Sequence, residues 1–590
     1  MKLSDYVIEY LVSKGTHHVF GMSGGAAVHL FDSAAKHPLM EPVFVAHEQS
    51  AAMAADGYYR VSGRVGASIV TSGPGATNLL TGVCCSYYDS IPSLLLTGQV
   101  ATHRLKGDRK VRQVGFQETD TLSMFSSVTK FQKQILRSDE IIDAMARAFS
   151  EAVADRPGPV HIDLPDDLQR ADVDPGKSSI PSITPNSSPK GLIKEQVNAL
   201  MNRLSLAERP AIVLGGGFST PRIVEKLREF LGRLDIPVLV TWAGLDLIPY
   251  DWKCRVGTFG VYGSRVGNFV VQNADLLICL GTRLSQNLTG GVLEKFAPGA
   301  HIAMVDIDRG ELDKFDGYGI EVDTRIHCSM QEFLAASDSV TQVFNAPNIH
   351  RWKERIDHWR LTLPTDIPTP PNDDLGYVDA NHFVQLLSDL LAEDELIFVD
   401  TGGNLTWTCN NLRVKKNQRV ISAWNFTPMG YSLPASIGGA IAAPNRPITC
   451  IIGDGGLQLC LGELATVVRY GLPIRIVLFN NHAHGIQKQT LETWLDGRYT
   501  GVDPDSGLGL SDFQHVVKAM GIPVIRIACS SDIGTKLRDA YSNPGPLLLN
   551  VEINPDQKLY PVLKSGSTLE NQMPYFKADI PKAIHDTPQK

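Results

Sequence analysis

Asp454 and Asn481 are the two residues whose type and spacing most strongly suggest chemistry. Asp454 follows the apolar run that ends at Gly453, and Asn481 follows a second apolar run over residues 474–479. Each lies at the carboxyl end of a predicted strand, where open parallel sheets bind ligands. A carboxylate, an amide oxygen and a main-chain carbonyl are hard ligands that suit Mg²⁺ or Ca²⁺. Taken separately, the two segments are more simply interpreted as an Asp-Gly turn and an Asn-Asn loop.

Glu48 is a second candidate, because it stands between a predicted strand at residues 43–45 and a predicted helix at residues 51–59. A buried carboxylate at such a junction is able to hydrogen-bond a bound heterocycle. The alternative is an ordinary glutamate at a helix start, where it favours the helix dipole.

A glycine-containing turn runs from Thr71 to Asn78 and joins a predicted strand to a helix. It contains Gly73-Pro74-Gly75, which allows main-chain N–H groups to face a ligand, and it ends on a polar side chain. Ordinary strand-to-helix turn chemistry explains the same residues equally well.

Length and composition limit the class of protein that must position these residues. The chain has 590 residues, 43% hydrophobic and 20% charged, with a formal net charge of −8 and an isoelectric point near 6.1. This composition is typical of a soluble globular protein and argues against nucleic-acid partners. Nine cysteines without a CxxC pair favour a reducing cytoplasm. We expect no signal peptide and no membrane span.

Strand-like and helical segments alternate along three blocks, which predicts an α/β fold of three doubly wound parallel-sheet domains. We expect an N-terminal domain at residues 1–173, a central domain at 192–345, a third domain at 375–565 and a tail at 566–590. Proline-rich segments at 174–191 and 363–374 are the predicted linkers.

Several segments, in order along nearly the whole chain, resemble the catalytic subunit of acetolactate synthases, which depend on thiamine diphosphate (ThDP). Because of this resemblance, we favour a metal and diphosphate site at Asp454 and Asn481 over two unrelated loops. The segments that carry it are 19–21, 24–26, His47-Glu48-Gln49, 71–78, 89–92, 98–100, Phe116-Gln117-Glu118, 156–160, Gly453-Asp454-Gly455 and Asn480-Asn481.

The resemblance implies a role for individual residues. Glu48 resembles the glutamate that hydrogen-bonds N1′ of the cofactor aminopyrimidine, and Gln117 resembles a catalytic residue supplied by the other subunit. Asp454, Asn481 and the carbonyl of Ala483 resemble the Mg²⁺ ligands. The other ThDP-binding residues implied are Asn78, Gly402, Gly403, Asn404, Met429, Gly455, Gly456, His484 and Gly485.

The middle block is similar to the FAD-binding domain of that family. The implied FAD residues are Arg156, Gly215, Gly216, Gly217, Thr241, Gly281, Arg283, Asp306 and Asp323. The alternative is a middle domain without a flavin, as in related decarboxylases. The family places its active site between two chains, so a homodimer or homotetramer is implied.

Two positions depart from the acetolactate synthase pattern. Asn287 stands where the family has an arginine that pairs with the carboxylate of the second 2-keto acid, and a neutral amide cannot make that contact. Thr490 stands where the family has a tryptophan, so the acceptor pocket is expected to be wider. Together with these two, the implied substrate residues are Gly25, Phe116, Gln117 and Ile486.

With these two substitutions, the chain resembles the acetolactate synthase-like flavoproteins of polysaccharide gene clusters. We therefore expect pyruvate as the donor and a ketone as the acceptor, such as the CDP-4-keto-3,6-dideoxyhexose that leads to yersiniose, a branched-chain sugar of lipopolysaccharide. The alternative is an acetolactate synthase whose acceptor carboxylate is held by another cation, such as Lys488. A decarboxylase or hydrolase, and a scaffold with a relic site, are further hypotheses.

Overall fold

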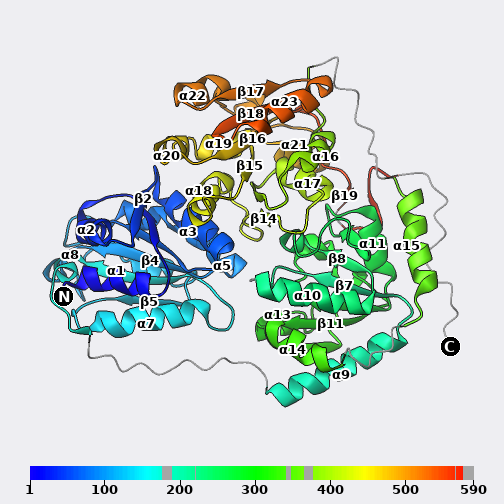
Figure 1. Cartoon of the computed structure of the whole chain (residues 1–590), viewed down its shortest axis with the longest axis horizontal. Coiled ribbons are helices and arrows are strands. Elements are labelled where there is room, and N and C mark those ends of the chain that lie inside the picture. Colours follow the sequence, from blue (N-terminus) through cyan, green and yellow to red (C-terminus); the bar gives the residue numbers. More distant parts are fainter. Residues whose placement is uncertain (176–188, 219–220, 341–346, 365–375, 565, 576–590) are drawn as a thin grey trace.

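The structure, a computed structural model, describes residues 1–175, 189–218, 221–340, 347–364, 376–564 and 566–575. Three α/β domains meet at the centre of the molecule (Figure 1). The three parallel sheets with flanking helices confirm the predicted fold class. Most of both predicted linkers lies outside the described residues, and so do residues 576–590 of the predicted tail.

The N-terminal domain is built on a six-stranded sheet in which neighbouring strands run parallel. β3 and β4 are buried along their whole length, as expected for central strands covered by helices on both faces. In sheet order the strands are β2 (Glu41–Phe44), β1 (His18–Gly21), β3 (Gly66–Val70), β4 (Ser93–Gln99), β6 (Val160–Pro165) and β5 (Phe131–Gln134). The helices are α1 (Leu3–Ser13), α2 (Val28–Lys36), α3 (Glu48–Ser62), α4 (Pro74–Asn78), α5 (Leu80–Asp89), α6 (Thr121–Phe125), α7 (Glu140–Val153) and α8 (Asp166–Gln169).

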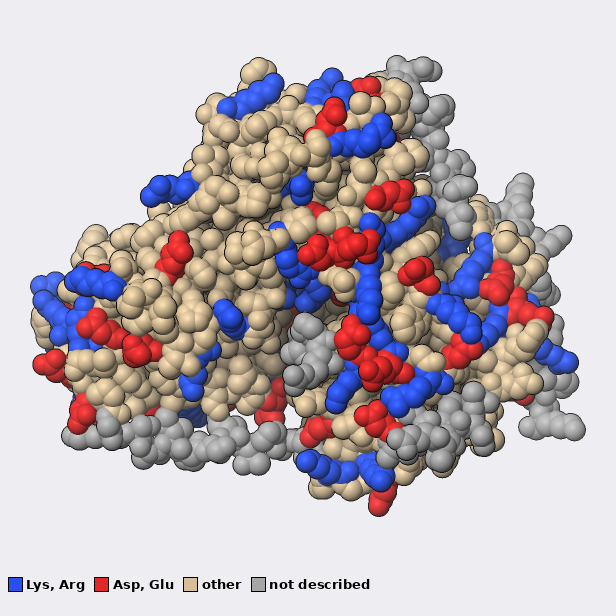
Figure 2. Space-filling view, viewed as in Figure 1, with Lys and Arg blue, Asp and Glu red and all other residues tan. Residues whose placement is uncertain are grey.

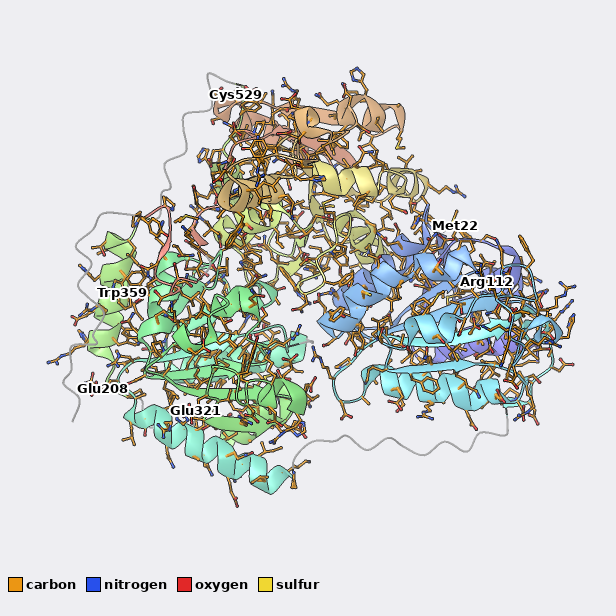
Figure 3. The ribbon with its side chains drawn as sticks, turned by 180° about the vertical axis from the view of Figure 1, so that it is seen from behind. Met22, Arg112, Glu208, Glu321, Trp359 and Cys529 are labelled. Atoms are coloured by element: carbon orange, nitrogen blue, oxygen red, sulfur yellow. The ribbon has the colours of Figure 1, made fainter. Side chains whose placement is uncertain are left out.

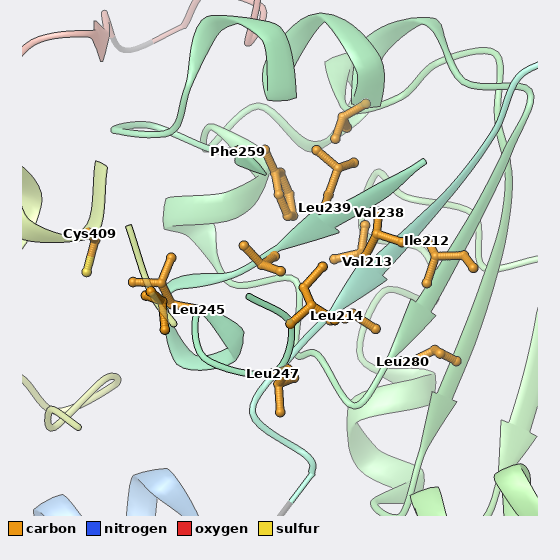
Figure 4. Packing of buried hydrophobic residues seen from close by; sticks show 14 of the residues in the cluster. Ile212, Val213, Leu214, Val238, Leu239, Leu245, Leu247, Phe259, Leu280 and Cys409 are labelled. Atoms are coloured by element: carbon orange, nitrogen blue, oxygen red, sulfur yellow. The ribbon is translucent and has the colours of Figure 1, made fainter. Parts of the chain in front are cut away.

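The middle domain repeats this architecture with six parallel strands. Its core packs apolar residues of β7 and β8 against Phe259 and Leu245 (Figure 4). In sheet order the strands are β12 (Thr324–His327), β11 (His301–Asp306), β10 (Leu276–Leu280), β7 (Pro210–Leu214), β8 (Val238–Val240) and β9 (Arg255–Thr258). The helices are α9 (Lys190–Leu206), α10 (Pro221–Leu234), α11 (Arg265–Asn273), α12 (Gln286–Thr289), α13 (Arg309–Asp313), α14 (Met330–Val340) and α15 (His350–Thr362).

Helix α15 packs on the middle domain although it follows residue 345. The Trp352 indole Nε1 donates a hydrogen bond to the Pro210 carbonyl at 3.1 Å, and the Trp359 ring meets Phe269 edge to face. Buried tryptophans of this kind contribute large apolar areas to a core. The packing of the middle domain therefore continues to the end of α15.

The C-terminal domain holds the third parallel sheet. In sheet order its strands are β14 (Arg419–Ile421), β13 (Leu396–Val399), β15 (Ile448–Gly453), β16 (Ile474–Asn480), β18 (Leu547–Glu552) and β17 (Val524–Ile527). The helices are α16 (Ala380–Leu390), α17 (Gly403–Asn411), α18 (Ser432–Ala442), α19 (Asp454–Leu459), α20 (Glu463–Arg469), α21 (Gly485–Leu495), α22 (Phe513–Ala519) and α23 (Ser530–Ser542). β15 and β16 are adjacent in the sheet, so their carboxyl ends meet at one edge.

The N-terminal and C-terminal domains are joined by a very close crossing of α3 and α18 (Figure 1). A Cβ atom placed on Gly57 would lie 2.1 Å from the carbonyl oxygen of Ala435, and one placed on Gly438 would lie 1.9 Å from that of Ala54. Only glycine leaves room for the two backbones at these points. The crossing matters for the site because α3 begins at Glu48.

We expect Gly438→Ala to lower the free energy of unfolding by about 1–3 kcal/mol, because the added methyl group must force two packed backbones apart. The measurement is the midpoint of urea-induced unfolding. Gly232→Ala in α10 is the matched control, since a Cβ atom there meets nothing within 4 Å. That control should be neutral or stabilising by up to about 1 kcal/mol, and equal effects of the two substitutions would contradict the tight crossing.

A buried charge network also links these two domains. The Arg60 guanidinium contacts Asp56 at 2.6 Å and Asp89 at 2.7 Å, and the Tyr431 hydroxyl of the C-terminal domain donates to Asp56 at 2.5 Å. Burial lowers and the two carboxylates raise the pKa of Arg60, which ends well above its usual value. Asp89 also accepts the main-chain N–H of Trp424 at 2.8 Å. The network therefore fixes the end of α5 to the segment after β14.

The last described segment, residues 566–575, packs on the middle domain rather than on the C-terminal sheet. Asn268 in α11 donates to the Leu569 carbonyl at 2.9 Å, and Arg265 donates to the Gln572 carbonyl at 3.1 Å. A short antiparallel pair of strands, β19 (Val562–Leu563) and β20 (Gln572–Met573), closes this segment. It thereby ties the C-terminal domain to the middle one.

The surface seen in Figure 2 interleaves acidic and basic side chains over the middle domain. Within the described ranges, no helix combines the length and apolar character needed to cross a membrane.

Candidate active site

Glu48 lies in a buried polar contact at the start of α3. Its side chain is 9% exposed, and its Oε2 accepts a hydrogen bond from the Asn78 amide at 2.9 Å. His47 caps the helix by accepting the N–H of Gln49 through its ring nitrogen. The fold thus brings together two residues that are thirty positions apart and that the sequence had assigned to the same cofactor.

The turn before α4 gathers further predicted residues around this contact. A Cβ atom on Gly75 would lie 3.5 Å from Glu48 Oε1, and one on Gly73 would lie 3.1 Å from the Gln117 Cβ. Gln117 has a φ of 63°, a costly conformation for a residue with a side chain. Phe116, its neighbour, is 86% exposed. Glu48, Asn78 and Gln117 therefore surround one turn.

Gly25 lies beside the same turn. The N–H of Ala26 donates to the Thr71 hydroxyl at 3.1 Å, and a Cβ atom on Gly25 would meet nothing within 4 Å. This position therefore faces open space next to the Glu48 group.

The predicted metal ligands converge at the carboxyl edge of the C-terminal sheet. Asp454 begins α19 directly after β15, and Asn481 follows β16. The Asp454 carboxylate accepts the N–H of Ala483 at 3.3 Å and that of Gly455 at 2.7 Å. Asp454, Asn481 and Ala483 are all buried. Parallel pairing of the two strands is what brings these residues together.

The Asp454 carboxylate forms no direct ion pair with the described residues. Burial raises its pKa to about 6, although the neighbouring His482 acts in the opposite direction. A nearby cation reverses such a shift by favouring the charged form. One carboxylate with amide and main-chain oxygens is the hard donor set that Mg²⁺ takes in proteins. The residues present therefore fit a divalent cation.

The residues expected at the cofactor diphosphate surround this carboxylate. A Cβ atom on Gly455 would lie 2.7 Å from His484 Nε2 and 3.6 Å from Met429 Cε. A Cβ atom on Gly485 would lie 2.9 Å from the Asn481 amide nitrogen. The glycines thus leave room for the His484, Met429 and Asn481 side chains to approach the main chain closely at this edge of the sheet.

The loop after β13 borders the same surface. Gly402 has a φ of 117°, and the Asn404 side-chain oxygen would lie 2.9 Å from a Cβ atom on it and 3.2 Å from one on Gly453. Gly403 begins α17 here, and Gly456 approaches the Asp400 carboxylate. The loop therefore lies against the end of β15.

Two acidic residues that hold the loops of this site in place were not predicted from the sequence. Asp400 accepts the N–H of Gly430 at 3.0 Å and that of Ser432 at 2.8 Å, which fixes the turn carrying Met429, and burial raises the pKa of Asp400 to about 6. Glu552 contacts His482, whose φ of 54° shapes the loop between two predicted metal ligands. The only available signal was their place at the end of a strand.

The Glu48 and Asp454 groups remain separate within one chain. Among the described residues, no hydrogen bond or ion pair joins Glu48, Asn78 or Gln117 to Asp454 or Asn481. The Glu48 group therefore belongs to the N-terminal domain and the Asp454 group to the C-terminal domain, with no direct polar contact between them in the described residues.

A cavity of about 500 Å³ lies where the three domains meet, and it contains most of the predicted flavin residues. Its lining includes Arg156, Gly216, Gly217, Thr241, Gly281, Arg283 and Asp306. Gly215 and Asp323 lie outside the lining: Gly215 packs against Gly281, and Asp323 accepts the N–H of Ile302 at 2.8 Å. The volume is that of a typical cofactor pocket.

The polar groups of this cavity fit a diphosphate-containing ligand. The buried Thr241 hydroxyl has no hydrogen-bond partner among the described residues. Arg156 and Arg283 share Glu311, at 3.0 Å and 2.6 Å, which fixes both guanidinium groups at the cavity. Burial raises the pKa of Asp306 to about 6. An unpartnered hydroxyl and two oriented arginines beside glycines are suited to phosphate oxygens.

The residues predicted at the acceptor lie in two places. Asn287 is exposed in the wall of the cavity. Ile486 and Thr490 lie on α21, where the Thr490 hydroxyl donates to the Ile486 carbonyl at 2.9 Å. Lys488 is buried, and its ammonium group forms an ion pair with Asp556 at 2.8 Å.

Comparison with known proteins agrees with this geometry. Residues 1–124, 197–336 and 400–551 match the N-terminal TPP binding, central and C-terminal TPP binding domains of thiamine pyrophosphate enzymes. A probable acetolactate synthase large subunit of Methanocaldococcus jannaschii is 33% identical, covering 97% of this chain and 95% of the relative. The acetolactate synthase isozyme 2 large subunit of Escherichia coli is 32% identical over 96% and 98%, and the large subunit of Lactococcus lactis is 29% identical over 95% and 94%.

Proposed function

Because the chain belongs to the thiamine pyrophosphate enzyme family that includes the acetolactate synthase large subunits, we propose that it is a pyruvate-decarboxylating carboligase. The reaction takes pyruvate, a carbonyl acceptor and one proton, and gives CO₂ and a product in which the acetyl group is joined to the former carbonyl carbon. The observation that carries the proposal is the presence, in one chain, of a Glu48–Asn78 contact at 2.9 Å and a buried Asp454 carboxylate beside Asn481 and Ala483.

In this proposal, some residues of the chain bind the cofactor and one residue holds a proton. When bound, ThDP supplies a carbon nucleophile and an electron sink, which allow the bond between C1 and C2 of pyruvate to break. Asp454, Asn481 and the Ala483 carbonyl would hold Mg²⁺. Glu48 holds a proton at N1′ of the aminopyrimidine, and Asn78 orients its carboxylate from 2.9 Å. Met429, whose methyl group lies near Gly455, would support the cofactor.

We also propose that the site is completed by a second copy of the chain, as a homodimer or homotetramer. In the part of the chain that the structure describes, no hydrogen bond or ion pair joins the Glu48 group to the Asp454 group. Phe116 at 86% exposure and Leu459 at 61% leave large apolar side chains uncovered near each of them. Covering such surface is a usual source of stability in oligomers.

FAD is the proposed ligand of the cavity between the domains. We expect Arg283→Ala to weaken FAD binding about 10- to 100-fold, since a charge-assisted contact to phosphate is lost. The measurement is the ratio of flavin absorbance to protein absorbance after gel filtration. Arg309→Ala is the matched control, because Arg309 pairs with Asp313 on the exposed face of α13. Equal flavin content in the two variants would contradict the assignment.

Two acceptor classes follow from different observations. The names of the relatives support a 2-keto acid, which would make the protein an acetolactate synthase. Asn287 is neutral, and Lys488 is paired with Asp556. Because neither side chain offers a free cation, they support an acceptor without a carboxylate. A ketone such as a CDP-4-keto-3,6-dideoxyhexose belongs to this second class.

The acceptor is identified by competition. Purified protein with ThDP, Mg²⁺, FAD and ¹³C-labelled pyruvate is given a panel of 2-keto acids, aldehydes and ketones, and the labelled products are identified by mass spectrometry. Acetolactate formed in preference to every mixed product supports the 2-keto acid class. Labelled acetyl groups on a ketone without a carboxylate, at the expense of acetolactate, support the second class. Release of CO₂ with acetaldehyde alone would contradict the carboligase proposal.

A further inference from the structure

A strongly basic loop precedes Phe116 and Gln117, and the proposed function leaves it unexplained. Residues 103–113, here called the basic loop, contain five lysine and arginine side chains and one acidic side chain, in a chain whose net charge is −8. Apart from the half-buried Lys106, these charged side chains are exposed. They are Arg104, Lys106, Asp108, Arg109, Lys110 and Arg112.

None of the five cations forms an ion pair in the part of the chain that the structure describes. Most other arginines of the N-terminal domain differ: Arg60, Arg137, Arg147 and Arg156 all contact acidic side chains. Like charges gathered on one short loop repel one another and create a positive potential that attracts anions. The loop therefore carries a charge that the folded chain does not neutralise.

The loop is held in place at both ends. At its start, Thr102 donates its N–H at 2.9 Å and its hydroxyl at 2.6 Å to the Asp167 carboxylate. At its end, the buried Glu118 accepts the N–H groups of Lys106, Val114 and Gly115. Arg109 folds back on the loop and donates to the Leu105 carbonyl at 3.1 Å. These contacts give the loop a defined shape.

A short chain of contacts leads from the loop to the Glu48 group. Glu118 directly follows Gln117, the Gln117 Cβ approaches Gly73, and the turn after Gly73 ends at Asn78, which donates to Glu48. Arg112 lies on the N-terminal domain, on the side away from the middle domain (Figure 3). The end of the loop is thus connected to the proposed reaction site through Gln117, and none of its cations lines the proposed flavin cavity.

We propose that the basic loop binds a phosphate or diphosphate group of the carbonyl acceptor, so that the enzyme selects a phosphorylated or nucleotide-linked acceptor. This inference rests on the proposed carboligase function. Arginine and lysine side chains are the usual partners of phosphate, because their N–H groups make charge-assisted hydrogen bonds to its oxygens. With Asn287 in place of a cation and Lys488 paired with Asp556, the loop is the cationic element left to recognise an anionic acceptor among the described residues near the site.

The test compares acceptors that differ by one phosphate. Holoenzyme saturated with ThDP, Mg²⁺ and FAD is given ¹³C-labelled pyruvate with dihydroxyacetone phosphate or with dihydroxyacetone, and kcat/KM is measured for each labelled product. The loop variant is Arg109→Gln, Lys110→Gln and Arg112→Gln combined. The control variant, Lys36→Gln, Arg64→Gln and Arg137→Gln combined, removes three exposed cations from the same domain.

We expect the wild type and the control variant to prefer the phosphorylated ketone by about 10- to 100-fold. The loop variant should lose most of this preference through KM. Equal kcat/KM for the two ketones in the wild type, or an undiminished preference in the loop variant, would overturn the proposal. A loop variant that keeps the preference but changes oligomeric state would instead assign the loop to a subunit interface.

A binding measurement separates this inference from the proposed function. Uridine diphosphate and uridine are titrated into the same holoenzymes by calorimetry, which requires no turnover. We expect uridine diphosphate to bind the wild type at least about tenfold more tightly than the loop variant, and uridine to bind both equally weakly. Absence of CO₂ release from pyruvate would refute the carboligase while leaving this result interpretable. Loop-dependent binding to anionic lipid vesicles, with no preference for uridine diphosphate over uridine, would refute the loop proposal.

Discussion

Glu48→Gln is expected to lower CO₂ release from pyruvate by about 10²- to 10⁴-fold while ThDP and Mg²⁺ remain bound. Glutamine has the same shape as glutamate and keeps an oxygen that accepts the Asn78 amide, so the local fold should survive. What is lost is the carboxylate that we propose shares a proton with N1′ of the aminopyrimidine. The measurement is single-turnover CO₂ release together with calorimetric binding of ThDP.

Glu41→Gln is the matched control for this prediction, since Glu41 is an exposed glutamate of the same domain, at β2. Its turnover should equal that of the wild type. If Glu48→Gln retained full turnover, Glu48 would have no role in proton transfer. If it lost ThDP as well as turnover, Glu48 would be a binding residue instead.

The second large effect is expected at Asp454. Asp454→Asn removes the only charged ligand from the proposed metal site, so ThDP and Mg²⁺ should bind at least about 100-fold more weakly. At a ThDP concentration near 100 times the wild-type Kd, the wild type should gain about 2.7 kcal/mol of stability, and the variant should gain almost none. Thermal unfolding with and without ThDP and Mg²⁺ measures this difference.

Asp539→Asn on the exposed face of α23 controls for the loss of one charge in the same domain. It should show the full ligand-induced rise in melting temperature. A similar rise in Asp454→Asn would show that the cation is held elsewhere.

Mixing the two inactive variants tests whether the Glu48 group and the Asp454 group of one site come from different chains. Random reassociation of Glu48→Gln and Asp454→Asn dimers makes half of them mixed, and each mixed dimer then has one intact site. We expect about a quarter of wild-type turnover to return. No recovery after verified subunit exchange would mean that each site is built within one chain.

The parallel order of the C-terminal sheet was predictable because its strands are continuous apolar runs that end on polar residues. The same logic placed Asp454 and Asn481 at one edge of that sheet, where the structure brings them together. The sequence could not identify Asp400 or Glu118 as positioning residues. Their hydrogen bonds go to main-chain N–H groups of distant or irregular segments, and such contacts leave no periodic pattern.

The extent of the middle domain was equally hard to predict. Helix α15 is separated from α14 by residues outside the described part of the chain, and its tryptophans find their partners more than eighty positions away. Of the predicted flavin residues, Asp323 fails to reach the cavity because its carboxylate bonds the main chain of β11. In both cases the outcome depends on long-range packing, which local propensity does not encode.

The glycine crossing of α3 and α18 also limits how the molecule can open. Two backbones in direct van der Waals contact have no intervening layer of side chains that could compress or slide. Main-chain contact therefore sets the relative position of the N-terminal and C-terminal domains within one chain, and these domains cannot move apart at this point without breaking the packing of α3 on α18.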